Sequence, residues 1–142
     1  MLLHALLAIV LVGAATHHAL VALGFLRGEF RTRLSRTYAA TTALTYLASV
    51  ALGALSYPTF RTHVRAYLDA ANPWAARLFE MKEDLATIGV PLVIGTWILS
   101  RVIDPREDRL LLPGYVAMVL ATTAIVWFNV TAGLMITMIK GV

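Results

Sequence analysis

The chain contains no cysteine and few charged residues. Without cysteine it cannot form disulfides, thiolate zinc sites or cysteine-ligated iron–sulfur clusters from its own residues. Charged residues make up 14% of the sequence and hydrophobic residues 59%, whereas soluble domains average about 25% and about 45–50%. A domain of 142 residues leaves much of its surface exposed, so water does not suit this composition. A lipid bilayer is the solvent that fits it.

Charged residues are also missing from four long stretches of the sequence. These stretches are Met1–Leu26, Thr37–Phe60, Leu85–Ser100 and Leu110–Ile139. A membrane-spanning helix needs about 20 apolar residues. The third stretch is shorter, about 24 Å of helix, but Lys82 and Arg101 just beyond its ends can reach the two interfaces. We therefore predict an all-α, polytopic four-transmembrane-helix bundle, a single domain over residues 1–142, with spans at about 2–26, 37–57, 83–102 and 112–138.

The loop between the second and third predicted spans, residues 58–82, has its own helical pattern. Its apolar residues recur at helical spacing, which predicts a short interfacial helix on the outer surface. We expect Tyr57-Pro58 to end the second span. We expect Asn72-Pro73 to begin a long helix that continues into the third span. The apolar residues of the short helix are Phe60, Val64, Tyr67, Leu68 and Ala71.

Basic residues are distributed unequally between the two sides of this topology. Seven arginines lie in the short first and third loops: Arg27, Arg31, Arg33, Arg36, Arg101, Arg106 and Arg109. The longer second loop and the C-terminus carry Arg61, Arg65, Arg77, Lys82 and Lys140. Because Lys and Arg in short loops favour the cytoplasmic side, both termini are expected on the non-cytoplasmic side of the cell membrane. Since the basic residues are divided among short segments, nucleic acid is not an expected partner.

Two adjacent histidines, His17 and His18, lie inside the first predicted span. An ionisable residue in a span needs a partner that offsets its desolvation, so both are candidates for a functional site. Haem b bound through one of them is one interpretation, with a second ligand from another subunit or from Met118. A neutral imidazole bonded to a hydroxyl is another, and a proton or quinone role is a third. Hydroxyls expected at this depth belong to Thr16, Thr37, Tyr38, Thr41 and Thr42.

Two further groups of polar residues are expected near the outer face. His4 and His63 could share a haem or a metal ion if the second loop folds back over the first span, or they could simply be solvated. A charge cluster precedes the third span and consists of Arg77, Glu80, Lys82, Glu83 and Asp84. Its spacing favours ion pairs along one helix. The cluster fits either a solvated collar or an outer proton port or partner site.

The second span also carries a face of small residues, with Thr41, Thr45, Ser49 and Gly53 at intervals of four. Small side chains let a neighbouring helix approach closely. That neighbour could belong to this chain or to another protomer.

Three functions follow from these features. The first is a small non-catalytic membrane subunit that anchors or completes a larger complex with other membrane subunits, with electron transfer through haem b as its most specific form. The alternative is an oligomeric channel or transporter for a neutral solute, because no charged residue lies deep in a span. An intramembrane enzyme with a histidine base ranks last, since no partnered nucleophile accompanies the histidines.

Overall fold

The computed structural model of the chain describes residues 2–140, with side chains described for residues 3–139. The chain is 89% helical, with no strand in the described part. Four helical runs are long and apolar enough to cross a membrane, as predicted. The elements, in order, are α1 (Leu2–Leu26), α2 (Thr32–Phe60), the π-helix η1 (Arg61–Arg65), α3 (Ala66–Ala71), α4 (Pro73–Val102) and α5 (Leu112–Lys140).

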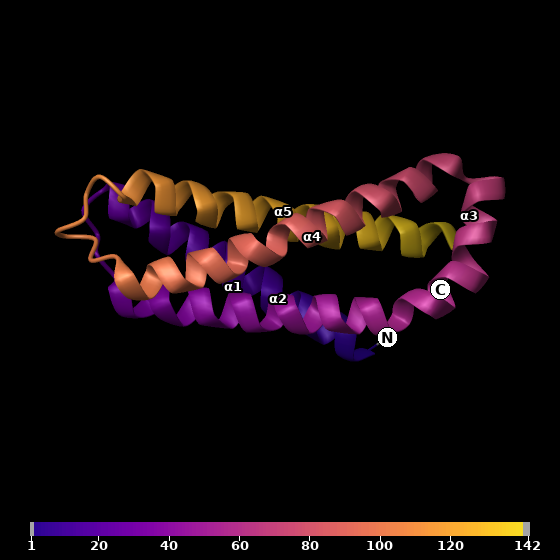
Figure 1. The fold of residues 1–142 in the computed structure, drawn as a ribbon, viewed down its shortest axis with the longest axis horizontal. Helices are drawn as coiled ribbons and strands as arrows, with labels where there is room; N and C mark the ends of the chain where they lie inside the picture. The colour runs from indigo at the N-terminus through magenta and orange to yellow at the C-terminus, as the bar shows by residue number, and fades with distance from the viewer. Residues whose placement is uncertain (1, 141–142) are drawn as a thin grey trace.

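The four long helices run up and down beside one another (Figure 1). Helix α1 packs on α2 and α5, and α4 packs on the same two helices. The short loops after α1 and α4 meet at one end of the bundle, which we call the loop end. Helix α3 turns the chain at the opposite end, which we call the α3 end, and the two termini lie towards that end (Figure 1).

The interior of the bundle is built largely from small side chains, and large apolar side chains point outwards. On α1, Ala15 and Ala22 are almost completely buried. On the outside, Ile9, Leu55 and Met138 are 69%, 78% and 81% exposed. A soluble protein rarely exposes so much apolar surface. Small side chains at helix interfaces and large aliphatic side chains on the outer surface are typical of helices packed in lipid. This pattern supports a multi-pass membrane protein.

Tyr57-Pro58 does not end the helix of the second predicted span, contrary to our expectation. Pro58 lies inside α2, and helical backbone continues from Thr32 to Ala71 through η1 and α3. Proline removes one backbone donor and bends a helix, but it does not have to terminate it. The wider turns of η1 follow at once, and Figure 1 shows the chain curving over the α3 end in this region.

The predicted start of the next helix is confirmed at Pro73, the first residue of α4. Asn72 contributes its backbone carbonyl, which accepts from the amides of Ala75 and Ala76 at 2.9 and 3.3 Å. Its side chain makes no capping bond. Helix α4 then continues unbroken to Val102, about 45 Å at 1.5 Å per residue. A helix of this length is long enough to cross a bilayer, although its uncharged stretch alone is short.

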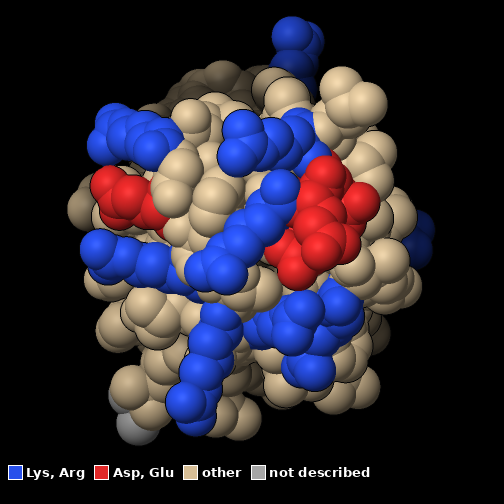
Figure 2. Space-filling view, turned by 90° about the vertical axis from the view of Figure 1, so that its left-hand side faces the viewer, with Lys and Arg blue, Asp and Glu red and all other residues tan. Residues whose placement is uncertain are grey.

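The loop end is strongly basic. All seven arginines of the two short loops and the adjoining helix ends belong to it, against the acidic residues Glu29, Asp104, Glu107 and Asp108. Figure 2, which faces this end, shows blue side chains surrounding two red patches. The concentration of arginine beside apolar helices is the pattern of a membrane interface.

Candidate functional site

A hydrogen-bonded group near the loop end joins three helices through His18, Ser35 and Tyr115. The Nε2 atom of His18 on α1 lies 2.9 Å from the Tyr115 hydroxyl on α5. The Ser35 hydroxyl on α2 lies 2.8 Å from the Tyr115 hydroxyl and 3.4 Å from His18 Nε2. Each of the three residues is only 2% exposed. Because buried polar groups are costly without partners, this group fixes the relative positions of α1, α2 and α5.

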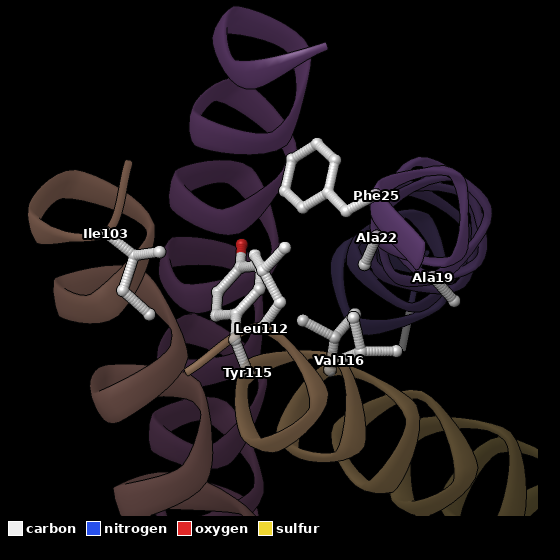
Figure 3. Packing of buried hydrophobic residues seen from close by; sticks show 8 residues of the cluster. Ala19, Ala22, Phe25, Ile103, Leu112, Tyr115 and Val116 are labelled. Carbon is white, nitrogen blue, oxygen red and sulfur yellow. The ribbon is translucent and has the colours of Figure 1, made fainter. Parts of the chain in front are cut away.

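Apolar packing holds the Tyr115 ring in place. The ring stacks on Phe25 with centroids 6.2 Å apart, and it meets the edge of the His18 ring at 6.0 Å. In Figure 3, Tyr115 lies between Ile103, just beyond α4, and Phe25 of α1, with its hydroxyl directed towards α2. A sterically fixed ring presents its hydroxyl at a single position. The bonding partner of His18 is therefore set by the packing of all four helices.

A small cavity lies on the loop-end side of this group. Its volume is about 10 Å³, and Thr32, Ser35, Ser100 and Tyr115 contribute polar atoms to its lining. That is roughly the space of one water molecule. In this packing Nε2 of His18, the ring nitrogen that could ligate a metal, is already in contact with the hydroxyls of Tyr115 and Ser35. The structure thus realises the interpretation of His18 as an imidazole paired with hydroxyls.

His17 lies in a different environment from its neighbour. Its side chain is on the outer surface of α1, on the same stripe as the exposed residues Leu6, Val10 and Leu20. Its Nδ1 atom is 2.7 Å from the Gly13 carbonyl oxygen, and its ring stacks on Tyr38 of α2 at 5.6 Å. A carbonyl can only accept, so Nδ1 carries the proton. A neutral ring then has the lone pair of Nε2 directed away from that bond.

His4 and His63 both lie towards the α3 end, but no metal site in the described part of the chain contains them. His4 belongs to the first turn of α1. His63 belongs to η1, where Nδ1 lies 2.8 Å from the Thr62 hydroxyl and 3.2 Å from the Thr59 carbonyl oxygen. Among the described residues, no group of three or more His, Cys, Asp or Glu side chains could hold a metal ion. A shared metal or haem between the two histidines stays a prediction.

The charge cluster before the third span has an ion-pair partner that the sequence pattern did not reveal. Glu80 pairs with Arg65 of η1, and Arg65 also lies 3.7 Å from Asp69. The pairing expected between Glu80 and Arg77 does not occur in the described residues. The reason is tertiary, since α3 packs against α4 and brings Arg65, which directly precedes α3, within reach of Glu80.

Lys82, by contrast, turns towards the bundle. Its Nζ atom lies 5.7 Å from the centroid of the Phe79 ring, and its side chain passes close to Gly133 of α5. The aliphatic stem of a lysine can cover apolar surface in this way. Glu83 and Asp84 lie on α4, the helix that also carries Arg77, Glu80 and Lys82.

The face of small residues on α2 is partly open. A methyl group added at Gly53 would meet no atom within 4 Å, and the hydroxyls of Thr41 and Thr45 bond to carbonyls of their own helix. A close contact between α2 and α4 lies elsewhere, where the Tyr46 hydroxyl of α2 packs on Gly89 of α4 and donates to the Ala86 carbonyl at 2.9 Å. Contact of the Thr41–Gly53 face with another protomer stays a prediction.

Comparison of the chain with protein-family models, with curated proteins and with solved structures gives no match.

Proposed function

We propose that this chain is a small, non-catalytic membrane subunit that anchors or completes a larger membrane complex. The observation that carries the proposal is the position of His17. It lies about 14 Å from the loop end of α1, at 1.5 Å per residue, and faces away from the bundle. Ionisable residues in membrane spans almost always face a protein interior or a water-filled cavity. The protein surface that His17 faces is then supplied by another subunit.

The energetics of hydrocarbon support this reasoning. An imidazole nitrogen without a hydrogen-bond partner is costly in a medium that contains no water. The described residues offer Nε2 of His17 no hydrogen bond, whereas Nε2 of His18 has two hydroxyls within reach. A partner subunit that covers the α1–α2 surface would bury His17 and Tyr38 together and could provide the missing bond.

Electron transfer through haem b is the most specific form of the proposal. Histidines that bind metals commonly donate from one ring nitrogen to a carbonyl and ligate through the other. His17 has this arrangement, with Nδ1 on Gly13 and Nε2 directed elsewhere. His17, and not His18, is therefore our proposed axial ligand, and a second ligand would come from the partner subunit. The haem would carry the electron, while this chain positions it in the membrane.

Co-purification tests the anchoring role. The tagged full chain is extracted from its native membrane in mild detergent, as wild type, His17→Leu and Leu20→Ala. Leu20 is 63% exposed on the same stripe and serves as the matched control. We expect the wild type and Leu20→Ala to retain the partner subunits. His17→Leu should bind them about tenfold more weakly, equivalent to ~1.4 kcal/mol. A wild type without partners, or equal retention in all three, would contradict the proposal.

Visible spectroscopy tests the haem. The purified complex is recorded oxidised and then reduced with dithionite. We expect a Soret band that is lost in His17→Ala and kept in His63→Ala, since His63 lies in η1 outside the bundle. A colourless complex that still contains its partners would reject haem and leave the anchoring role in place.

The alternative function, an oligomeric channel or transporter for a neutral solute, has one observation in its favour. Several buried polar atoms of α2, α4 and α5 have no hydrogen-bond partner among the described residues, which would suit a polar path. They are the hydroxyls of Thr42, Ser49, Thr96 and Thr122 and the indole nitrogen of Trp97. Reconstituted liposomes distinguish the two functions. A colourless homo-oligomer that releases a neutral solute would favour the channel.

We also propose that the loop end faces the cytoplasm and that both termini face away from it. The support is the concentration of arginine at the loop end. The chain has no cysteine, so a single introduced thiol reports sidedness without background. With an impermeant maleimide added to intact cells, we expect Ala70→Cys to be labelled and Glu107→Cys to be labelled only after lysis. The reverse pattern would overturn the orientation.

A further inference from the structure

At the loop end, a groove runs along the outer surface beside α2 and the end of α4. It has a volume of about 660 Å³, and its basic side chains are Arg33, Arg36 and Arg101. Deeper along the groove, the lining consists of Ala40, Leu44 and Thr41, and the Thr41 hydroxyl donates to the Thr37 carbonyl of its own helix, so this part is largely apolar. From Arg36 to Leu44 the helix advances about 12 Å. The groove therefore combines a cationic mouth with an apolar continuation towards the bilayer interior.

The positive charge of the groove is not neutralised by the protein. No acidic residue lines it, and none of the three arginines makes an ion pair among the described residues. Three of the four acidic residues at the loop end have other partners: Glu29 lies 3.6 Å from Arg31, and the carboxylates of Asp104 and Asp108 accept backbone amides. Three guanidinium groups at one interface attract an anion.

Arg36 is held in place by the end of α4. Its Nε donates to the Ser100 carbonyl at 3.0 Å, and one of its terminal nitrogens donates to the Arg101 carbonyl at 3.4 Å. These carbonyls belong to the last turn of α4 and therefore have no hydrogen-bond partner within their own helix. The contacts fix the guanidinium without cancelling its charge, because carbonyls are neutral acceptors. One wall of the groove is thus preorganised.

We propose that this groove binds one anionic phospholipid, with its phosphodiester on Arg33, Arg36 and Arg101 and an acyl chain along Ala40 and Leu44. Charge complementarity at headgroup depth selects an anionic over a zwitterionic lipid, and the apolar continuation selects a lipid over a free phosphate. Neither His17 nor Tyr38 lines the groove, and the inference does not depend on the proposed function.

Native mass spectrometry of the detergent-purified full chain tests the site. The chain is titrated with dioleoyl-phosphatidylglycerol and with dioleoyl-phosphatidylcholine, which share their acyl chains. We expect one molecule of phosphatidylglycerol to be retained in preference to phosphatidylcholine. The double variant Arg33→Gln/Arg101→Gln should bind it roughly 25-fold more weakly, from ~1 kcal/mol for each arginine. Arg36 stays unchanged, because it also caps α4.

Arg106→Gln/Arg109→Gln is the matched control, since it removes the same charge from the same end but outside the groove. We expect it to change the affinity less than about threefold. Equal weakening in both double variants would show a diffuse surface field and overturn the site. Thermal melting of each variant confirms that it is folded.

Two further measurements separate a lipid from its headgroup. Ala40→Trp fills the apolar part of the groove without altering its charge, and we expect it to weaken lipid binding. Inorganic phosphate at millimolar concentration should not displace the lipid. Displacement by phosphate together with normal binding to Ala40→Trp would show a simple anion site and reject the lipid.

Discussion

The hydrogen-bonded group of His18, Ser35 and Tyr115 offers a direct test of what fixes the helices. We expect Tyr115→Phe to destabilise the chain, because it removes the hydroxyl bonded to both partners at 2.9 and 2.8 Å. The phenyl ring stays, so its packing on Phe25 is kept. The whole effect is then polar.

The magnitude follows from two lost bonds. Hydrogen bonds between membrane helices average ~0.6 kcal/mol, with a maximum of ~1.7. Two such bonds give about 1–2 kcal/mol, and a buried group left without a partner adds to this. The Ser35 hydroxyl, 3.4 Å from His18 Nε2, can move closer and recover part of the loss. We therefore expect a decrease of about 1–2 kcal/mol in the free energy of unfolding.

Unfolding in mixed micelles of mild detergent and sodium dodecyl sulfate measures this free energy. Tyr38→Phe is the control, because the Tyr38 hydroxyl has no hydrogen bond to any of the residues that the structure describes, and it should change stability by less than about 0.5 kcal/mol. A double-mutant cycle with Ser35→Ala should give a coupling energy of at least about 0.5 kcal/mol. A Tyr115→Phe variant as stable as wild type, or a coupling energy of zero, would refute the reasoning.

Two other substitutions test the close contacts between segments in the same assay. Gly89→Ala places a methyl group against the Tyr46 hydroxyl and should destabilise the chain by about 1–3 kcal/mol through overpacking. Gly53→Ala is the control, because its methyl group meets no atom within 4 Å, and it should be neutral or slightly stabilising; equal effects of the two variants would contradict the helix contact. Glu80→Gln removes the partly exposed ion pair with Arg65 and should lower the free energy of unfolding by ~0–1 kcal/mol, with a smaller effect at high salt. A loss of stability that does not depend on salt would contradict an electrostatic origin.

The presence of four long apolar helices could be predicted because hydrocarbon imposes a one-dimensional rule. A segment without charge and long enough to cross a bilayer is recognisable without knowledge of its neighbours. Pro73 likewise begins α4 as predicted, since its fixed φ and missing amide suit a first helical turn. The prediction that Pro58 ends a helix was wrong, because this effect of a proline depends on more than the local sequence. Whether a proline ends a helix or only bends it depends on the contacts that follow, here the packing of α3 on α4.

The partners of the polar side chains were much harder to predict. Tyr115, 97 positions from His18, was not among the hydroxyls expected at that depth. A comparison of depths across antiparallel helices could have suggested it, because both residues lie near the loop end of their helices. The partner of Glu80 was missed in the same way, since Arg65 belongs to a different helical segment.

The sequence alone determined that four segments are long and apolar enough to cross a membrane as helices, and where basic residues gather, because these properties depend only on local composition and segment length. Only the tertiary structure decided that His18 is enclosed by hydroxyls while His17, one residue earlier, faces outwards. Adjacent residues on a helix point about 100° apart, so the choice depends on how α1 is rotated against α2 and α5. That rotation is set by the packing of side chains from all the helices together, which no single segment specifies.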